Sequence, residues 1–431
     1  MLTMNESEVG LTIKVVAERT GISVHTLRAW ERRYGIPSPR RDAANRYRLY
    51  AEDDIADVLW LKQQVGSGIP PAQASALLRQ RNSQPRGFAM AEATQPIAAT
   101  QTALLDAFSK SDEAAARRIL DEAFALFAPE QVALQIIEPT MEEIGERWMR
   151  NEMTIWQEHL ASNVVQQKLY AVLQSQSALS ITAPSLVAAC APNEEHVLGL
   201  LTFSLLAQRQ GWRVISLGQS TPLADLNDLA RTSKPDIVVV AVTTVIGLSG
   251  LIPWLDATNR SPTKVAFGGR MLDLLPTLRA HMPGEYLGAD GFVASRNLVA
   301  LKPHAKYWVP SKRMGSATNA LRAQRLKIAG NTVARFMGTL PSNLQRKWNT
   351  TDLNHATLFL VDVLSSALAF GVPELMDMER AWLKEAMPPR AVPAELIVKY
   401  IGTFARMLGQ LFPKEQNRLY QPLVERMKNH N

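Results

Sequence analysis

The sequence predicts a multidomain protein that combines all-α domains with an α/β domain, and three observations support this. The chain has 431 residues, enough at roughly 150 residues per domain for about three cores. Short apolar runs typical of buried strands alternate with helical segments between residues 185 and 281, and helical periodicity dominates on either side. Residues 1–86 carry a net charge of +4 and residues 301–431 a net charge of +10, so the middle carries −7. Basic ends suit anionic partners, although a basic excess also serves solubility.

The composition excludes several classes of protein. Hydrophobic residues make up 46% of the chain, but no apolar run approaches the ~20 residues that cross a bilayer. The first residues lack the basic-then-apolar layout of a signal peptide. Cys190 is the one cysteine of the sequence, which excludes a disulfide framework and a multi-cysteine metal site. We expect a soluble, cytoplasmic protein in which Cys190 serves packing rather than chemistry.

Residues 1–80 have the pattern of a helix-turn-helix. Ile13–Thr20 predicts a first helix, which Gly21 ends in the left-handed conformation. Ser23 is a suitable N-cap for a second helix over Val24–Tyr34, and the second helix of such a unit enters a major groove. Seven arginines lie between positions 28 and 48 against two acidic residues, a density that suits phosphate neutralisation. A helical cap with a solvated basic face is the alternative.

The same stretch resembles the MerR-type winged helix-turn-helix family. The resemblance lies in TLRAWERRYGIP at 26–37, PRR at 39–41 and RYRLY at 46–50, and it continues to position 68. We expect Trp30 and Tyr34 to pack in the core, with base reading as the alternative. The resemblance implies a DNA-facing set on the second helix and in or near the wing: His25, Arg28, Arg32, Arg40, Arg46 and Tyr47.

Residues 81–100 predict a flexible linker, and residues 101–180 predict a helical bundle. The linker is poor in large apolar residues and contains Pro85, Gly87 and Pro96. From 102 to 176, apolar residues recur at three- and four-residue spacing, punctuated by two prolines. This spacing predicts three or four helices with one apolar stripe each, which make a small (four-helix) bundle.

Residues 181–303 predict a doubly wound, flavodoxin- or Rossmann-like domain. The expected strands are 186–191, 213–217, 237–242 and 264–267, and the expected helices are 197–209, 223–231, 248–257 and 271–281. Continuous apolar strands that alternate with helices indicate a parallel sheet covered on both faces. Ligands of such sheets bind at the carboxyl ends of the strands. Glu194, His196 and Gly199 follow the first expected strand, and Gly268 and Gly269 follow the fourth.

Taken alone, these residues leave the chemistry open. Glu194 can orient the ring of His196 while its other nitrogen faces a metal, but a helix-capping histidine explains the same residues. Trp148, followed after nine residues by Glu158 and His159, is also weak evidence alone, because a histidine on a helix surface is common.

Together, the residues resemble the cobalamin-binding part of CarH-type photoreceptors. The resemblance lies in the Glu194-x-His196-x-x-Gly199 motif, in Thr243 at the end of the third strand, in Gly268-Gly269, and in the Trp148-x(9)-Glu158-His159 element of the bundle. It implies that His196 is the lower axial ligand of cobalt. It also implies that Trp148, Glu158 and His159 surround the upper, adenosyl face, and that His159 takes the upper axial position after photolysis. The family's usual Ser-x-Leu element has Thr and Val here, a departure where the nucleotide tail is held.

Residues 304–431 predict an additional all-helical domain. Residues 302–347 hold ten Lys and Arg and no acidic residue. The helical stretch 355–425 faintly resembles the globin-like bilin-binding domain of photocobilins. Because residues 304–431 contain no cysteine, the resemblance implies a non-covalent bilin such as biliverdin, its propionates held by Arg or Lys. His355 could serve a haem or a bilin. A dimerisation or DNA-contacting domain, in which His355 is an ordinary helix residue, is the alternative.

The resemblance implies a light-responsive repressor that binds adenosylcobalamin and operator DNA as a dimer or tetramer and dissociates after photolysis. A MerR-type regulator that does not use cobalamin, switched by a partner protein or by redox chemistry, is the second hypothesis. A cobalamin enzyme is disfavoured, because the residues after the cobalamin domain are too few for the ~250 of a catalytic barrel. We therefore assign no catalytic residues.

Overall fold

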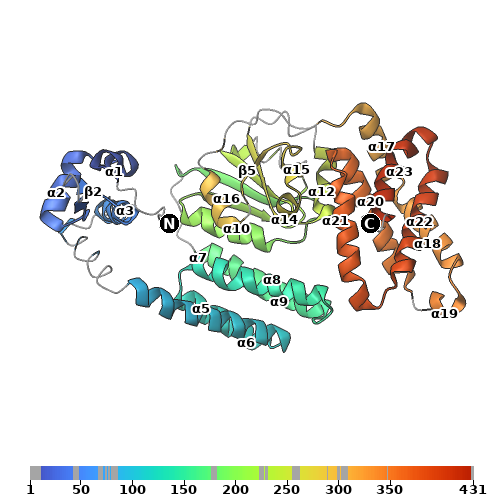
Figure 1. The fold of residues 1–431 in the computed structure, drawn as a ribbon, viewed down its shortest axis with the longest axis horizontal. Coiled ribbons are helices and arrows are strands. Elements are labelled where there is room, and N and C mark those ends of the chain that lie inside the picture. The colour runs from blue at the N-terminus through green and yellow to red at the C-terminus, as the bar shows by residue number, and fades with distance from the viewer. Residues whose placement is uncertain are drawn as a thin grey trace, which may run out of the picture. The chain divides into compact units, whose positions relative to one another are not determined.

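The computed structural model describes residues 11–41, 48–66, 71–72, 75, 78, 86–175, 182–222, 228, 232–254, 263–288, 290–298, 301, 309–346 and 348–428 (Figure 1). The chain divides into two compact units, Met1–Pro96 and Ile97–Asn431. Each unit is described by itself.

The first unit is the expected helix-turn-helix with a two-stranded wing. Its elements are α1 (Ile13–Thr20), α2 (Val24–Tyr34), β1 (Arg40–Arg41), β2 (Arg48–Leu49) and α3 (Glu52–Gly66). Gly21 ends α1 with φ of 64°, and the Ser23 hydroxyl accepts from the Thr26 N–H at 3.1 Å. Leu27 and Leu61 are fully buried in its core. The local signals for these two helices therefore coincide with their ends.

The linker prediction for residues 81–100 is wrong from Arg86 onward. One helix, α5 (Arg86–Ser109), runs through this stretch with Pro96 inside it. The physical reason is composition: alanine, the strongest helix former, recurs between residues 89 and 99. Alanine is small enough for a linker but also has the highest helix propensity.

The second unit begins with a helical bundle that adds four helical segments to α5. They are α6 (Glu113–Leu126), α7 (Pro129–Gln131) with the π-turn Val132–Ile137, α8 (Glu138–Met149) and α9 (Ile155–Ser175). Asp112 caps α6 by accepting from the Ala115 N–H at 2.9 Å. Pro129 stands at the start of α7, where the missing N–H costs nothing.

A five-stranded parallel sheet follows, in the order β4-β3-β5-β6-β7. Its strands are β3 (Ser185–Cys190), β4 (Arg213–Gly218), β5 (Ile237–Ala241), β6 (Lys264–Gly268) and β7 (Glu285–Tyr286). Four of them lie within one residue of the predicted bounds. The fifth, β7, is only two residues long and carries no apolar run that could have predicted it.

Successive residues of the sheet face two different cores. Leu186, Ala188 and Cys190 point toward α10 (Leu198–Arg209), α16 (Gly291–Asn297) and the bundle. Val187, Ala189 and Ala191 belong to the opposite core, with α12 (Val245–Leu251), the 3₁₀ turn Ile252–Trp254, α14 (Arg270–Leu274) and α15 (Pro276–Arg279). The helix predicted at 223–231 lies mostly outside the described residues.

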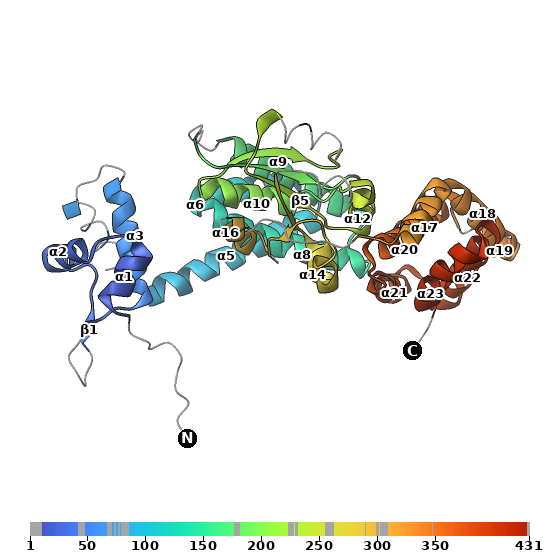
Figure 2. The ribbon, with the colours of Figure 1, turned by 90° about the horizontal axis from the view of Figure 1, so that it is seen from above.

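The C-terminal residues form helices, as predicted (Figure 2), and their buried apolar residues belong to the second of these cores. The elements are α17 (Lys312–Ala323), α18 (Arg325–Gly338), α19 (Ser342–Gln345), α20 (Thr350–Phe370), α21 (Glu374–Ala386), the turn Pro388–Arg390, α22 (Ala394–Leu411) and α23 (Lys414–Lys428). Helix α20 contacts α12 and is surrounded by α17, α18 and α21. It is long and apolar enough to cross a membrane, but 72% of its apolar window is buried inside the fold, as in the core helix of a globular domain.

Candidate functional site

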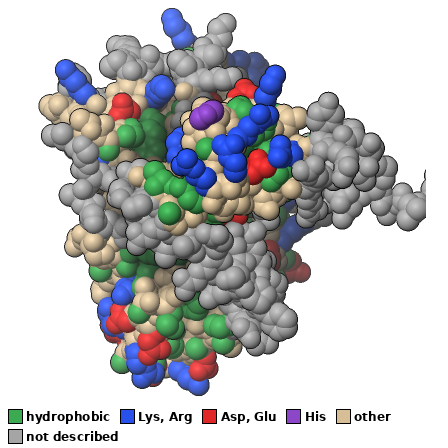
Figure 3. All heavy atoms as spheres, turned by 90° about the vertical axis from the view of Figure 1, so that its left-hand side faces the viewer, with side chains coloured by type: hydrophobic (Ala, Val, Ile, Leu, Met, Phe, Trp, Pro, Cys, Tyr) green, Lys and Arg blue, Asp and Glu red, His purple; other side chains and the backbone are tan. Residues whose placement is uncertain are grey.

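Helix α2 presents the side chains predicted to meet DNA. His25, Arg28 and Arg32 are exposed, whereas Leu27 is fully buried. Positions 25, 28 and 32 are three and four residues apart and share one helix face. Figure 3 shows Lys and Arg side chains gathered around one histidine on this side of the molecule. A basic, solvent-facing helix surface of this kind can enter a major groove.

The wing is fastened to α2 through Glu31. Its carboxylate pairs with Arg48 Nε at 3.0 Å and accepts from the Tyr50 hydroxyl at 3.2 Å. Burial and the nearby Glu31 raise the pKa of Tyr50 to about 12. Trp30 packs against the core of the first unit, as predicted, and Tyr34 is half-buried.

Of the predicted wing residues, the structure describes the backbone of Arg40. Arg40 pairs with Leu49 across β1 and β2. The Arg40 side chain and both Arg46 and Tyr47 lie outside the described residues.

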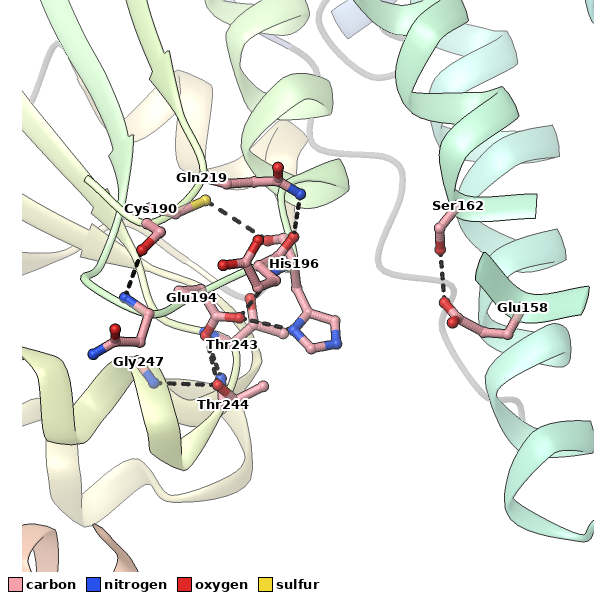
Figure 4. Close-up of polar contacts among 12 residues, drawn as sticks. Glu158, Ser162, Cys190, Glu194, His196, Gln219, Thr243, Thr244 and Gly247 are labelled. Carbon is pink, nitrogen blue, oxygen red and sulfur yellow. Dashed lines mark hydrogen bonds and ion pairs between the residues drawn. The ribbon is translucent and has the colours of Figure 1, made fainter. Parts of the chain in front are cut away.

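The centre of the second unit's site is the carboxylate of Glu194, which is fully buried just after β3 (Figure 4). Oε1 contacts His196 Nδ1 at 2.8 Å and accepts from the His196 N–H at 3.1 Å. Oε2 accepts from the N–H groups of Thr243 and Thr244 at 2.9 and 2.7 Å, and from the Thr244 hydroxyl at 2.9 Å. The carboxylate thus joins the loops after β3 and β5 and fixes the His196 ring.

The two titratable groups of this pair stabilise each other's charge. Burial opposes the ionisation of Glu194, but hydrogen bonds from His196 and Thr244 outweigh it and hold its pKa below the ordinary value. The hydrogen bond to Glu194 raises the pKa of His196 against the opposing effect of burial, and the charge of Glu158 adds to the rise. Glu194 is therefore an anion that orients the imidazole.

Two glycines of α12 that the sequence analysis missed make room for this loop. A Cβ on Gly247 would stand 2.6 Å from Glu194 Oε2, and a Cβ on Gly250 would stand 2.2 Å from the Pro192 carbonyl oxygen. Both contacts are closer than real Cβ atoms come to a neighbour. The three-residue spacing places both glycines on one helix face, which is the sequence signal that could have identified them.

The residues around His196 fit a metal that takes one protein nitrogen. Its Nε2 makes no hydrogen bond with any residue that the structure describes, and 63% of the side chain is exposed. A ring whose Nδ1 faces a carboxylate keeps Nε2 for a metal. A Cβ on Gly199 would meet nothing within 4 Å, so there is open space at the start of α10, three residues after His196.

Gly268 and Gly269 lie at the end of β6, the strand that pairs with β5. Gly268 accepts from the Val242 N–H at 2.9 Å. Gly269 has φ of 105°, and a Cβ there would stand 2.5 Å from the Val242 carbonyl oxygen. Gly269 is thus required by the backbone that carries Thr243.

The bundle presents Glu158 and His159 from the first turn of α9. Glu158 Oε2 contacts His159 Nδ1 at 2.6 Å, and Oε1 accepts from the Ser162 hydroxyl at 2.7 Å. His159 is largely exposed. Figure 4 shows the Glu158 carboxylate turned toward the side on which His196 lies. The structure therefore places two carboxylate–imidazole pairs, one on the sheet and one on the bundle.

Trp148 lies in the last turn of α8 and has an unpredicted neighbour. The guanidinium of Arg390 stands over its ring, 4.8 Å from the centroid. Arg390 comes from the C-terminal helices, so a residue missed by the sequence analysis contacts a residue that it had singled out. No local pattern could have paired positions 148 and 390.

His355 is exposed on α20 and does not join His196 or His159. It lines a cavity of about 310 Å³ with Arg322, Arg325 and Phe359 of the C-terminal helices and with Asn193 and Ile246 beside the Glu194 loop. Arg322 donates to the Ser249 carbonyl at 2.9 Å, which holds α17 against α12.

Cys190 is a packing residue. It is fully buried, and burial with the nearby charges of Glu194 and Glu195 raises the pKa of its thiol to about 12. A thiol with such a pKa stays protonated and unreactive at neutral pH.

Two family models match the chain. Residues 11–81 match the MerR HTH family regulatory protein, and residues 100–173, which are the bundle, match the B12 binding domain.

Curated relatives combine the same parts. The HTH-type transcriptional repressor CarH of Myxococcus xanthus is 34% identical over 231 residues, which are 52% of this chain and 76% of that protein. The HTH-type transcriptional repressor CarA of the same organism is 30% identical over 297 residues, 68% of this chain and 96% of that protein. The HTH-type transcriptional regulator MlrA of Salmonella typhimurium is 36% identical over 78 residues, 18% of this chain and 32% of that protein.

These relatives are transcriptional regulators, which places this chain among regulators rather than enzymes. The chain belongs to the family of CarH- and CarA-like proteins, in which a MerR-type helix-turn-helix precedes a B12-binding domain.

Proposed function

We propose that this protein is a light-responsive repressor that binds operator DNA through α2 and its wing and binds adenosylcobalamin between the sheet and the bundle. The observation that carries the cobalamin part is the His196 ring, whose Nδ1 contacts a buried carboxylate and whose Nε2 makes no hydrogen bond within the described part of the chain. The two matched family models and the CarH and CarA relatives support both the DNA-binding part and the cobalamin-binding part of the proposal.

His196 would hold the lower axial position of the cobalt, and Glu194 would keep its ring in place. Trp148, Glu158 and His159 would border the cofactor from the bundle, and His159 would be a second residue able to ligate the cobalt. When bound, adenosylcobalamin supplies a cobalt–carbon bond that green light breaks. Gly268 and Gly269 would lie near the nucleotide tail.

The response to light would follow from quaternary structure. A ligand that contacts both the bundle and the sheet favours one arrangement of the two, and its loss removes that preference. If the dark form is a dimer or tetramer, several helix-turn-helix units contact DNA together, and dissociation weakens binding far more than the loss of one contact. We propose that dark, adenosylcobalamin-bound oligomers repress and that illuminated subunits leave the operator.

The test is an absorption spectrum and a size-exclusion profile of the full chain with adenosylcobalamin, before and after green light. We expect a protein-bound spectrum that changes with light, together with a smaller species after illumination. His196→Ala should bind cobalamin without the histidine-ligated spectrum, whereas Glu195→Gln, on the same loop, should behave as wild type. A spectrum equal to that of free cobalamin and an unchanged size would contradict the proposal.

The second hypothesis, a regulator that does not use cobalamin, predicts that the His196 variant still responds to its signal. Redox switching through a thiol is disfavoured, because the one cysteine of the chain is buried and its pKa is raised. Switching by a partner protein is the form of this hypothesis that a negative cobalamin result would favour.

Two finer expectations stay predictions. A bilin such as biliverdin near His355 should produce a new red absorption band when it is added to the protein. An unchanged biliverdin spectrum would contradict the bilin prediction. A cytoplasmic location follows from the proposed role on DNA, and cell fractionation tests it.

A further inference from the structure

Arg390 joins two helix ends that are far apart in the sequence. Its Nη1 donates to the carbonyl oxygens of Met149 at 3.0 Å and Ala386 at 2.7 Å, and its Nη2 donates to that of Trp148 at 3.0 Å. Met149 ends α8 and Ala386 ends α21. A cation at the C-terminus of a helix satisfies unpaired carbonyls and opposes the helix dipole, and here one guanidinium does so for two helices.

The segment around Arg390 is built to hold this position. Pro388 and Pro389 precede it in a 3₁₀ turn, and Ala391 follows with φ of 56°. The proline rings fix the φ angles of these two residues and so restrict the backbone that presents Arg390. A second contact supports the first: the Asn151 side-chain amide donates to the Pro389 carbonyl at 3.3 Å.

The bundle side of this contact leads directly to the site. Residues 150–154 connect α8 to α9, whose first turn carries Glu158 and His159. The far end of the connection is fixed by Gln157, whose side chain accepts from the Thr154 N–H at 2.9 Å. Arg390 therefore holds one end of a short connection that has the Glu158–His159 pair at its other end.

We propose that Arg390 is a positioning residue that ties the C-terminal helices to the upper, bundle side of the cobalamin site, so that the state of this side is transmitted to the C-terminal domain. The guanidinium covers one face of the Trp148 ring and leaves its orientation dependent on α21 and the Pro388–Arg390 turn. The role of Trp148 toward cobalamin rests on the proposed function. The contacts of Arg390 with the end of α8 do not depend on it.

Amide hydrogen exchange of the full chain without cobalamin tests the tie. Arg390→Gln should accelerate exchange at residues 150–153 by about tenfold, because hydrogen bonds from a charged donor to the end of α8 are lost. Arg418→Gln removes an exposed arginine of α23 and should leave these amides unchanged. Arg390→Lys keeps the charge but lacks the two Nη donors of the guanidinium, and should restore protection of these amides from exchange only in part. Equal exchange in the Arg390→Gln and Arg418→Gln variants would overturn the tie.

The rate of the spectral change under green light tests the transmission. With adenosylcobalamin added, Arg390→Gln should alter this rate at least twofold relative to Arg418→Gln, and Arg390→Lys should lie between them. An unaltered rate in a variant with faster exchange would overturn the transmission. If the wild type does not bind cobalamin, the proposed function fails, whereas the exchange experiment still decides whether Arg390 holds the end of α8.

Discussion

At the scale of single residues, the site depends on how one buried carboxylate is shared. Glu194 accepts from two backbone N–H groups and a hydroxyl through one oxygen and contacts His196 through the other. Its neighbour Glu195 is exposed and has no such role. Of the two adjacent acidic residues, Glu194 is therefore the buried one that contacts His196, and Glu195 is the exposed one.

Glu194→Gln should weaken cobalamin binding by roughly 10–100-fold, as the loss of a ligand's hydrogen-bonded partner typically does. The amide keeps the size of the side chain, but its NH2 group faces either His196 or the N–H donors of Thr243 and Thr244. Spectroscopic titration with cobalamin measures the change, and Glu195→Gln is the matched control. Wild-type affinity in the Glu194 variant would show that the carboxylate does not orient the histidine.

At the scale of elements, a substitution can test the proposed DNA-facing side of α2. Arg32→Ala should weaken binding to duplex DNA about tenfold and lower the magnitude of the salt-dependence slope by about 1, because one phosphate contact is lost. Arg33 stands about 100° further round the helix, and Arg33→Ala should change the affinity less than twofold. Fluorescence anisotropy at several salt concentrations measures both. Equal losses for the two variants would indicate non-specific charge rather than a defined face.

Helix α21 contains a buried acid that makes stability depend on pH. Glu379 is 4% exposed, and burial raises its pKa from 4.5 to about 7. Below pH 4.5 the carboxyl is protonated in both the folded and the unfolded state. As pH rises from 4.5 to 7 the unfolded state loses its proton first, so the folded state is progressively disfavoured, by about 3 kcal/mol above pH 7.

Glu379→Gln removes this penalty and should raise the thermal midpoint of unfolding at pH 8 clearly more than at pH 5. Differential scanning calorimetry at the two pH values measures the difference. Glu385→Gln, at an exposed position of the same helix, should shift the midpoint little at either pH. A shift that does not depend on pH would contradict the raised pKa of Glu379.

The elements also show which features a sequence can predict. Helix Val24–Tyr34 has the predicted bounds: Ser23 caps its start, as predicted, and Gly35 follows its last residue in the left-handed conformation. Four strands were found within a residue because parallel strands buried on both faces read as continuous apolar runs. The 81–100 segment misled because alanine-rich sequence suits both linkers and helices. Glu194 and His196 were identified by motif, but Gly247 and Arg390 act through contacts across the fold.

At the scale of the whole molecule, the sheet separates two cores. One core joins the sheet to the bundle that carries Glu158 and His159, and the other joins it to the C-terminal helices. The basic excess of residues 302–347 lies partly on the exposed surfaces of α17 and α18, for example at Lys312 and Lys327, and partly inward at Arg322. Part of this charge thus serves internal packing, and the exposed part remains available for an anionic partner.

The most direct test of the central claim is DNA binding by the full chain in the dark and after green light, with adenosylcobalamin present. A duplex is first selected from a random library in the dark with cobalamin bound. We predict tight dark binding to the selected duplex, at least tenfold weaker binding after illumination, and a smaller effect of light on a His196→Ala variant, in which cobalamin is no longer held by the histidine. Equal affinity in the dark, after light and without cobalamin would contradict the account.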